Sequence, residues 1–300
     1  MAPAWKYFCR GCPGPGRDER WDDQPCPNCG GWWSIIARRA GDGGTGRVAV
    51  EDGERISLCH ISENVVEVPR YVIGGDLASV DRVLGGGLVP GSLTLLAGPP
   101  GVGKSSLTLA LLQQLAQSLR VLYAVGEESL MRVSERAARF GGKFHERLEV
   151  IRQTELDEIL FHVEDAQAKV VVIDSVQTLA CSSQRSGEDL DQGSAASISV
   201  AMRTIADHIQ KDAQDVAVIA IGHVTQDGSI SGPRSGLLHA VDCVLYFDGK
   251  PQETRRVLRA DGKNRFGATA GPEAVAYFEM TPQGLIAVPE ADTQPAAVNA

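Results

Sequence analysis

The sequence predicts an α/β fold with a mostly parallel central sheet, preceded by a small cysteine-rich module. Apolar runs of strand length alternate with segments whose apolar residues recur at helical spacing, which is typical of a parallel sheet covered by helices on both faces. A glycine-rich turn joins one of these strands to a helix, and two closely spaced cysteine pairs lie near the N-terminus. We expect the module at 1–36, a flexible linker at 37–71, the α/β domain at 72–288 and a disordered tail at 289–300.

The cysteine pairs have the spacing of a structural metal site. Cys9 and Cys12 form one C-x2-C motif, and Cys26 and Cys29 form a second one after thirteen intervening residues. Four thiolates suit the tetrahedral coordination of Zn²⁺ and leave no open position for catalysis. A redox pair usually occurs singly beside a βαβ unit, and disulfides need an oxidising compartment, so both alternatives are less favoured. The pattern predicts a zinc knuckle whose folding energy comes largely from the metal.

The glycine-rich turn has the pattern of a phosphate-binding loop. It follows an apolar run at 92–97 and opens into a helical pattern at 106–115. Glycines allow backbone N–H groups to surround a phosphate, and the helix start adds unpaired donors. In this motif the lysine reaches the β- and γ-phosphates and the following hydroxyl binds Mg²⁺. The sequence therefore predicts a nucleoside triphosphate site made by Gly98, Pro99, Pro100, Gly101, Val102, Gly103, Lys104, Ser105 and Ser106.

The remaining elements follow in alternation. We expect parallel strands at 121–126, 148–151, 170–174 and 216–221, and helices at 129–140, 155–168 and 194–212. Polar loops are expected at 181–193 and 222–233. Three closely spaced strands at 243–247, 256–260 and 275–280 indicate antiparallel additions at one sheet edge.

Several candidate catalytic residues end strands of this sheet. Asp174 ends a buried strand, where a carboxylate meets the shell of a bound Mg²⁺. Glu127 and Glu128 follow the strand at 121–126, so either could activate the attacking water, and their spacing does not choose between them. His223 closes the strand at 216–221 and could sense the γ-phosphate or be structural.

The strongest basic cluster lies between residues 255 and 265. Two acidic residues, Glu253 just before it and Asp261 within it, accompany five cations: Arg255, Arg256, Arg259, Lys263 and Arg265. Such a run is most often a solvated face. It could also supply a cation to a neighbouring subunit's nucleotide or contact a phosphate backbone.

Composition bounds the remaining possibilities. A formal net charge of −9 gives no general attraction to nucleic acid, so any such contact must come from a local basic patch. There is no apolar N-terminal signal segment and no apolar run near the ~20 residues that span a bilayer. We expect a cytoplasmic protein without membrane association.

Taken together, the motifs resemble the bacterial RadA (Sms) family, RecA-like ATPases of DNA recombination and repair. The resemblance covers about residues 9 to 288 and is carried by motifs in a fixed order: the four-cysteine knuckle, Asp81-Arg-Val-Leu-Gly-Gly-Gly-Leu-Val-Pro-Gly91, the phosphate loop, Val125-Gly-Glu-Glu-Ser129, Val172-Ile-Asp-Ser-Val-Gln-Thr-Leu179, Gly222-His-Val-Thr225, Gly232-Pro-Arg234 and Lys263-Asn-Arg-Phe-Gly267. Among RecA-like relatives, the last of these is specific to this family.

The resemblance implies a RecA-like P-loop ATPase core that forms a hexameric ring on single-stranded or branched DNA and extends heteroduplex together with a RecA-type recombinase. Glu127 would match the catalytic glutamate. Lys263 and Arg265 would act at the neighbouring protomer's ATP, and Arg185, Arg234 and Arg265 become candidates for DNA contact.

The sequence departs from the family in two places. The family continues into a Lon-protease-like C-terminal domain, which does not follow Val288 here. Asp261 and Gly262 separate Ala260 from Lys263 where the family has one residue, which predicts a bulge or turn. An ATP-switched assembly module of KaiC-like type, with the knuckle binding protein, is the alternative function. A small-molecule phosphotransferase is less favoured, because no arginine-rich lid segment is evident.

Overall fold

The computed structural model describes residues 5–9, 27, 35–39, 69–141, 144–181, 192–223, 239–250 and 252–288, in two compact units that divide between residues 66 and 67. In the first unit, β1 (Trp5–Cys9) pairs antiparallel with β2 (Ile35–Arg39). The four cysteine side chains, most of the predicted linker, Arg185, Arg234 and the predicted tail lie outside the described residues. The predicted domain boundaries stay predictions.

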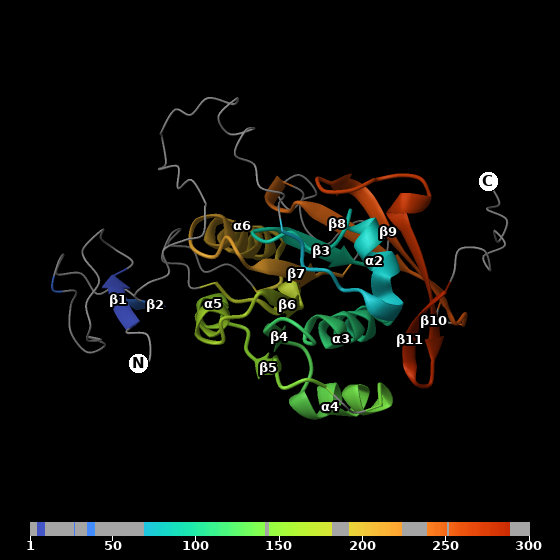
Figure 1. Ribbon diagram of the computed structural model, residues 1–300, viewed down its shortest axis with the longest axis horizontal. Helices are drawn as coiled ribbons and strands as arrows, with labels where there is room; N and C mark the ends of the chain where they lie inside the picture. The colour runs from blue at the N-terminus through green and yellow to red at the C-terminus, as the bar shows by residue number, and fades with distance from the viewer. Residues whose placement is uncertain are drawn as a thin grey trace. The chain divides into compact units, whose positions relative to one another are not determined.

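The second unit is built on a sheet of nine strands in the order β11-β10-β9-β8-β3-β7-β6-β4-β5 (Figure 1). The run from β8 to β5 is parallel, which confirms the predicted α/β fold. Its strands are β3 (Leu93–Ala97), β4 (Val121–Val125), β5 (Leu148–Arg152), β6 (Val170–Asp174), β7 (Ala217–Ile221) and β8 (Cys243–Asp248). Every residue of β3, β4, β6 and β7 is buried, as expected for strands covered on both faces.

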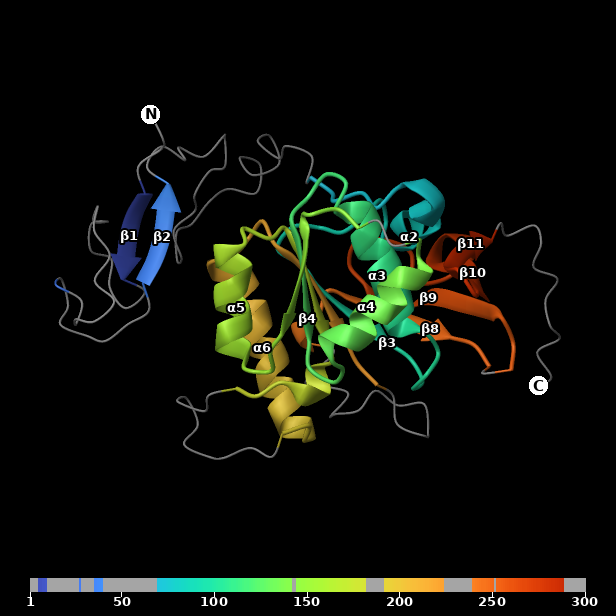
Figure 2. The same cartoon turned by 90° about the horizontal axis from the view of Figure 1, so that it is seen from below.

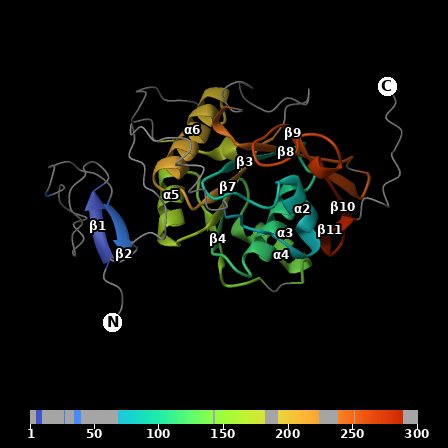
Figure 3. The same ribbon diagram turned by 45° about the horizontal axis from the view of Figure 1, so that its top comes forward.

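Helices cover both faces of the sheet (Figure 2). On one face lie α2 (Ala78–Val83), preceded by the short helix η1 (Gly75–Leu77), α3 (Lys104–Leu115) and α4 (Leu130–Arg139). On the other face lie α5 (Leu156–Asp165) and α6 (Ala195–Lys211) (Figure 3). Each face of the sheet has its own hydrophobic core, and successive residues of a strand pack into opposite cores. Tyr123 packs on the side of α3 and Leu122 on the side of α5 and α6.

The antiparallel additions predicted at one edge are present. The strands β8, β9 (Arg255–Asn264), β10 (Val275–Thr281, after the short helix η3, Pro272–Ala274) and β11 (Gly284–Val288) pair antiparallel in succession. The register between β8 and β9 shifts between the pairs Leu245–Ala260 and Cys243–Asn264. This shift confirms the bulge or turn expected at Asp261 and Gly262, and it gives β9 two more residues than β8 over that stretch.

The expected elements agree with the structure to within a few residues. The strands β1, β2 and β11, the helix α2 and the short helices η1, η2 (Val176–Thr178) and η3 were not predicted. Polar side chains set helix starts: the Ser129 hydroxyl accepts a hydrogen bond from the Arg132 N–H, and the Ser194 hydroxyl accepts one from the Ser197 N–H. Among the described residues, no helix is both long and apolar enough to cross a bilayer.

The parallel strands end level at one edge of the sheet. Val125 of β4 pairs with Asp174 of β6, Asp174 pairs with Ile221 of β7, and Ile221 pairs with Leu96 of β3. The loops that leave these four strands therefore begin side by side. In open α/β sheets, ligands bind in the crevice outside these carboxyl ends.

Candidate active site

The turn from β3 to α3 is held in a narrow backbone geometry by its glycines. Gly101 and Gly103 have φ angles of 74° and 107°, in the region that residues with side chains rarely adopt. A Cβ atom on Gly98 would lie 2.2 Å from the Phe247 carbonyl oxygen of β8. The loop can approach its neighbours and turn into α3 only because these positions lack side chains.

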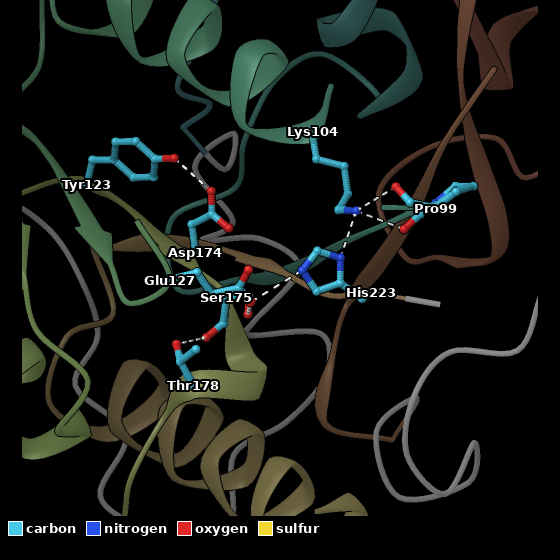
Figure 4. A network of polar contacts seen from close by, with 9 residues as sticks. Pro99, Lys104, Tyr123, Glu127, Asp174, Ser175, Thr178 and His223 are labelled. Carbon is cyan, nitrogen blue, oxygen red and sulfur yellow. Dashed lines mark hydrogen bonds and ion pairs between the residues drawn. The ribbon is translucent and has the colours of Figure 1, made fainter. Parts of the chain in front are cut away.

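Lys104 is buried at the start of α3, with 5% of its surface exposed. Its Nζ donates to the carbonyl oxygens of Gly98 at 2.8 Å and Pro99 at 3.0 Å, and it lies 3.1 Å from Nδ1 of His223 (Figure 4). Burial lowers the pKa of Lys104 to about 8, and the charges of Asp174 and Glu127 oppose this shift. The buried Lys104 ammonium is thus bonded to neutral carbonyl oxygens, which are weaker acceptors for a cation than phosphate oxygens.

Asp174, at the end of β6, lies beside the start of α3. Its carboxylate is hydrogen-bonded to the Ser105 side chain, and the buried Tyr123 hydroxyl donates to its Oδ2 at 2.7 Å. Burial raises the pKa of Asp174, and the two hydrogen bonds act in the opposite direction. A hydroxyl and a carboxylate oxygen next to a phosphate loop are the donor set that Mg²⁺ takes in such sites.

Glu127, just beyond the end of β4, connects the neighbouring strand ends. Its Oε1 accepts a short hydrogen bond from the Ser175 hydroxyl and lies 3.3 Å from Nε2 of His223 (Figure 4). Because His223 also contacts Lys104, side chains from three strand ends and from α3 form one polar chain.

Glu128 lies in a different environment from Glu127. Its two carboxylate oxygens accept hydrogen bonds from the guanidinium of Arg136 in α4, at 2.5 and 2.8 Å. This bidentate pair is only partly exposed, with 16% of the Glu128 side chain and 23% of the Arg136 side chain accessible. Glu128 therefore links the last turn of α4 to the end of β4, while Glu127 is turned toward His223 and Ser175.

Lys263 and Arg265 lie at the end of the sheet where the parallel strands begin, opposite to the phosphate loop. Asn264 pairs with Cys243, which pairs with Thr94 near the beginning of β3, whereas the phosphate loop follows the end of β3 at Ala97. Arg265 is 57% exposed and forms an ion pair with Asp242 at 2.7 Å. Burial, and then the charge of Arg265, lower the pKa of Lys263. Neither side chain belongs to the cluster around Lys104.

The turn that carries these two cations is anchored firmly. The Asn264 amide donates to the carbonyl oxygens of Val83 and Ala268, and its Oδ1 accepts from the N–H groups of Phe266 and Gly267. A Cβ atom on Gly85 would lie 2.0 Å from the Phe266 carbonyl oxygen, so the glycine-rich turn after α2 packs directly on this segment. The segment thus presents Lys263 and Arg265 from a rigid support.

The basic cluster predicted on β9 is not one surface. Arg256 is buried, with 6% exposed, while Arg259 stacks over the Tyr246 ring and pairs with Asp248 at 3.5 Å. Alternate residues of a strand point to opposite faces, so a run of cations along β9 is divided between the core and the solvent.

One pH effect follows from the position of Lys104. Without nucleotide, Lys104 loses its proton near pH 8, because burial disfavours its charge. We expect a triphosphate bound at Lys104 to raise the Lys104 pKa again, so that binding above pH 8 takes up a proton. Affinity for a nucleoside triphosphate is then highest below pH 8 and falls by up to about tenfold per pH unit above it. Calorimetric titrations at several pH values, in two buffers of different ionisation enthalpy, measure both effects. In Lys104→Arg the cation does not titrate, and a slope that persists there would contradict this origin.

The comparison that decides the family is a match to a protein-family model described as "AAA domain", which covers residues 71–229. The chain belongs to this AAA domain family. The matched range contains the phosphate loop, Glu127, Asp174 and His223, so the AAA domain of this chain holds the whole polar cluster described above.

The AAA domain and its flanks are similar to DNA repair proteins named RadA. The chain is 36% identical to that of Escherichia coli K12 over 298 residues, which is 95% of this chain and 60% of the relative. It is 35% identical to that of Haemophilus influenzae Rd (95% and 59%) and 36% identical to that of Pseudomonas aeruginosa PAO1 (89% and 56%). The resemblance expected from the motifs is confirmed, and the chain spans about 60% of the length of these relatives.

A solved structure shares the fold of the AAA domain. The KaiC-like protein PH0186 from Pyrococcus horikoshii OT3 matches with a TM-score of 0.55 and 19% identity, over 75% of this chain and all of that one. At this identity the likeness concerns the fold alone.

Three contacts in the AAA domain were not foreseen from the sequence: the Tyr123 bond to Asp174, the Ser175 bond to Glu127 and the pairing of Arg136 with Glu128. A phenol within the apolar strand β4 was the available signal for the first, since a buried hydroxyl needs a partner. Arg136 is eight residues from Glu128, and only the path of the chain into α4 reveals that pair.

Proposed function

We propose that the chain is an ATP hydrolase of the RadA type that acts in DNA repair and recombination. The observation that carries the proposal is the meeting of Lys104, Asp174, Glu127 and His223 at one sheet edge, beside a phosphate loop. Similarity to RadA proteins supports the DNA-repair context. The chain spans about 60% of the length of these RadA proteins, so their DNA-repair activity is part of what is proposed for it.

The proposed roles follow from the positions of the side chains. Lys104 leaves the carbonyl oxygens of Gly98 and Pro99 and binds the β- and γ-phosphates of ATP. Ser105 and Asp174 would hold Mg²⁺, which would neutralise charge on the phosphates. Tyr123 keeps one Asp174 oxygen turned toward the core.

We assign the orientation of the attacking water to Glu127 rather than Glu128. Both oxygens of Glu128 are occupied by Arg136, whereas Glu127 faces the chain from Ser175 to His223. His223, placed between Lys104 and Glu127, then changes partners when the γ-phosphate arrives, so it is suited to sensing the nucleotide.

Lys263 and Arg265 are proposed to complete the site of a neighbouring copy in a hexameric ring. They lie at the amino ends of the parallel strands, whereas the phosphate loop lies at the carboxyl ends. A head-to-tail ring brings the amino-end surface of one copy against the carboxyl-end surface of the next. Single-stranded or branched DNA and a RecA-type recombinase are the proposed partners, with Arg185, Arg234 and Arg265 as DNA contacts. The proposed location is the cytoplasm.

ATP turnover with and without single-stranded DNA, across a salt series, tests this function. We expect DNA to raise turnover, and the increase to fade between about 50 and about 200 mM salt as cations compete for the DNA phosphates. Turnover that is indifferent to DNA at every salt concentration would contradict the DNA-dependent part and favour the nucleotide-switched assembly module instead.

We further propose a structural Zn²⁺ on Cys9, Cys12, Cys26 and Cys29, because the spacing of the two C-x2-C motifs suits four-thiolate coordination. Metal analysis is expected to find one zinc per chain, lost in Cys12→Ser, while ATP binding by the second unit is retained. A wild-type chain that is free of zinc when purified under reducing conditions would contradict the site.

A further inference from the structure

Arg256 of β9 is a buried cation that reaches the phosphate loop from behind. Its Nε donates to the carbonyl oxygen of Val102 at 2.8 Å, and the arginine is only 6% exposed. Its Nη1 donates to the carbonyl oxygens of Glu253 at 2.6 Å, Arg255 at 2.7 Å and Lys250 at 3.2 Å. Among the described residues, these hydrogen bonds all go to backbone carbonyls and none to a carboxylate. One guanidinium thus joins the loop to the turn between β8 and β9.

The bond to Val102 has a consequence for the direction of the loop's donors. In a planar trans peptide, the C=O and the following N–H point to opposite sides. Holding the Val102 carbonyl toward Arg256 therefore turns the Gly103 N–H to the opposite side of the loop. An inward-turned N–H is what a phosphate loop needs, and the positive charge of Arg256 adds positive potential behind it.

The rest of the antiparallel extension supports the same loop. The Phe247 carbonyl of β8 closes against Gly98, where a Cβ would lie 2.2 Å away. The Met280 thioether of β10 lies 3.4 Å from the position of a Cβ on Gly103. Gly249 leaves room for the arginine, since its own Cβ would lie 2.5 Å from Cδ of Arg256. Residues of β8, β9 and β10 thus each lie against the loop.

We propose that Arg256 is a positioning residue for triphosphate binding: it sets the orientation of the Val102–Gly103 peptide and supplies a second buried cation behind the loop. The inference rests on the proposed ATP function and adds to it a role for the antiparallel extension. It gives Arg256 a different role from Arg259, which pairs with Asp248, and from Arg265, which pairs with Asp242.

The test compares Arg256→Met and Arg256→Lys in equilibrium titrations with MgATP, at a temperature where thermal unfolding shows each to be folded. Arg256→Met keeps the aliphatic stem and loses every donor, so we expect the dissociation constant to rise roughly tenfold or more, about 1.4 kcal/mol. Arg256→Lys restores the positive charge without the planar set of guanidinium donors, so we expect MgATP affinity to recover only in part. Lys250→Gln is the matched control, because it removes a 76% exposed cation from the turn that Arg256 contacts.

The outcomes separate this inference from the proposed function. MgATP affinity in Arg256→Met within twofold of wild type, while Lys104→Ala loses binding, would overturn the role of Arg256 and leave the ATP site intact. Loss of affinity in Lys250→Gln equal to that in Arg256→Met would also overturn it, since any nearby charge would then suffice. If Arg256→Met fails to fold, the test rests on Arg256→Lys. A dissociation constant for MgATP and a turnover rate equal to those of wild type at every salt concentration would then overturn the orienting role.

Discussion

Replacing Glu127 by glutamine is expected to lower ATP turnover by about 10²- to 10⁴-fold, the range that a positioned general base contributes. The glutamine keeps the shape of the side chain and its contact with Ser175 but cannot take a proton from water. MgATP affinity should stay close to that of wild type or rise slightly, because a negative charge near the γ-phosphate is removed. Single-turnover hydrolysis and equilibrium binding, measured on the same preparation, separate the two effects.

The matched control is Glu128→Gln, one residue away. Glu128 is bound by both nitrogens of the Arg136 fork, so its loss should act on stability, by about 1–3 kcal/mol, rather than on chemistry. Turnover at a temperature well below unfolding should stay within a few-fold of wild type. A reversed pattern, with Glu128→Gln inactive and Glu127→Gln active, would show that the Arg136 pair opens during catalysis and that Glu128 is the base.

Lys104→Ala is expected to abolish measurable hydrolysis. An arginine finger, which is likewise a cation on the transferring phosphates, is worth about 10³–10⁵ in rate, and we expect a loss of at least this order. Alanine leaves the helix intact and removes a charge whose burial is unfavourable, so the unfolding temperature should be unchanged or higher. Turnover by the purified variant, with Lys211→Ala on the exposed face of α6 as control, measures the effect. Hydrolysis by Lys104→Ala within tenfold of wild type would mean that the phosphates bind elsewhere.

The sequence predicted the parallel sheet and its strand-end residues because both depend on short-range patterns. Apolar runs such as Val170–Asp174 and the glycine-rich loop carry their signals within a few residues. Since parallel strands end at one edge, placing Glu127, Asp174 and His223 at strand ends was enough to bring them together.

What the sequence could not supply were pairings between distant segments. The Arg256 bond to Val102 joins positions 154 residues apart, and the Tyr123 bond to Asp174 joins positions 51 apart. On β9 a run of cations suggested one basic surface, but strand alternation turns Arg256 inward. The choice between Glu127 and Glu128 likewise depends on where α4 places Arg136.

The central claim is that this chain binds a magnesium–triphosphate at the carboxyl edge of its sheet. Calorimetric titration of the purified 300-residue chain with MgATP at pH 7 tests it most directly. We expect one site per chain, with binding lost in Lys104→Ala and retained in Glu127→Gln. A folded wild-type chain that gives no binding heat and no shift in unfolding temperature with MgATP, or equal binding by Lys104→Ala, would contradict the account.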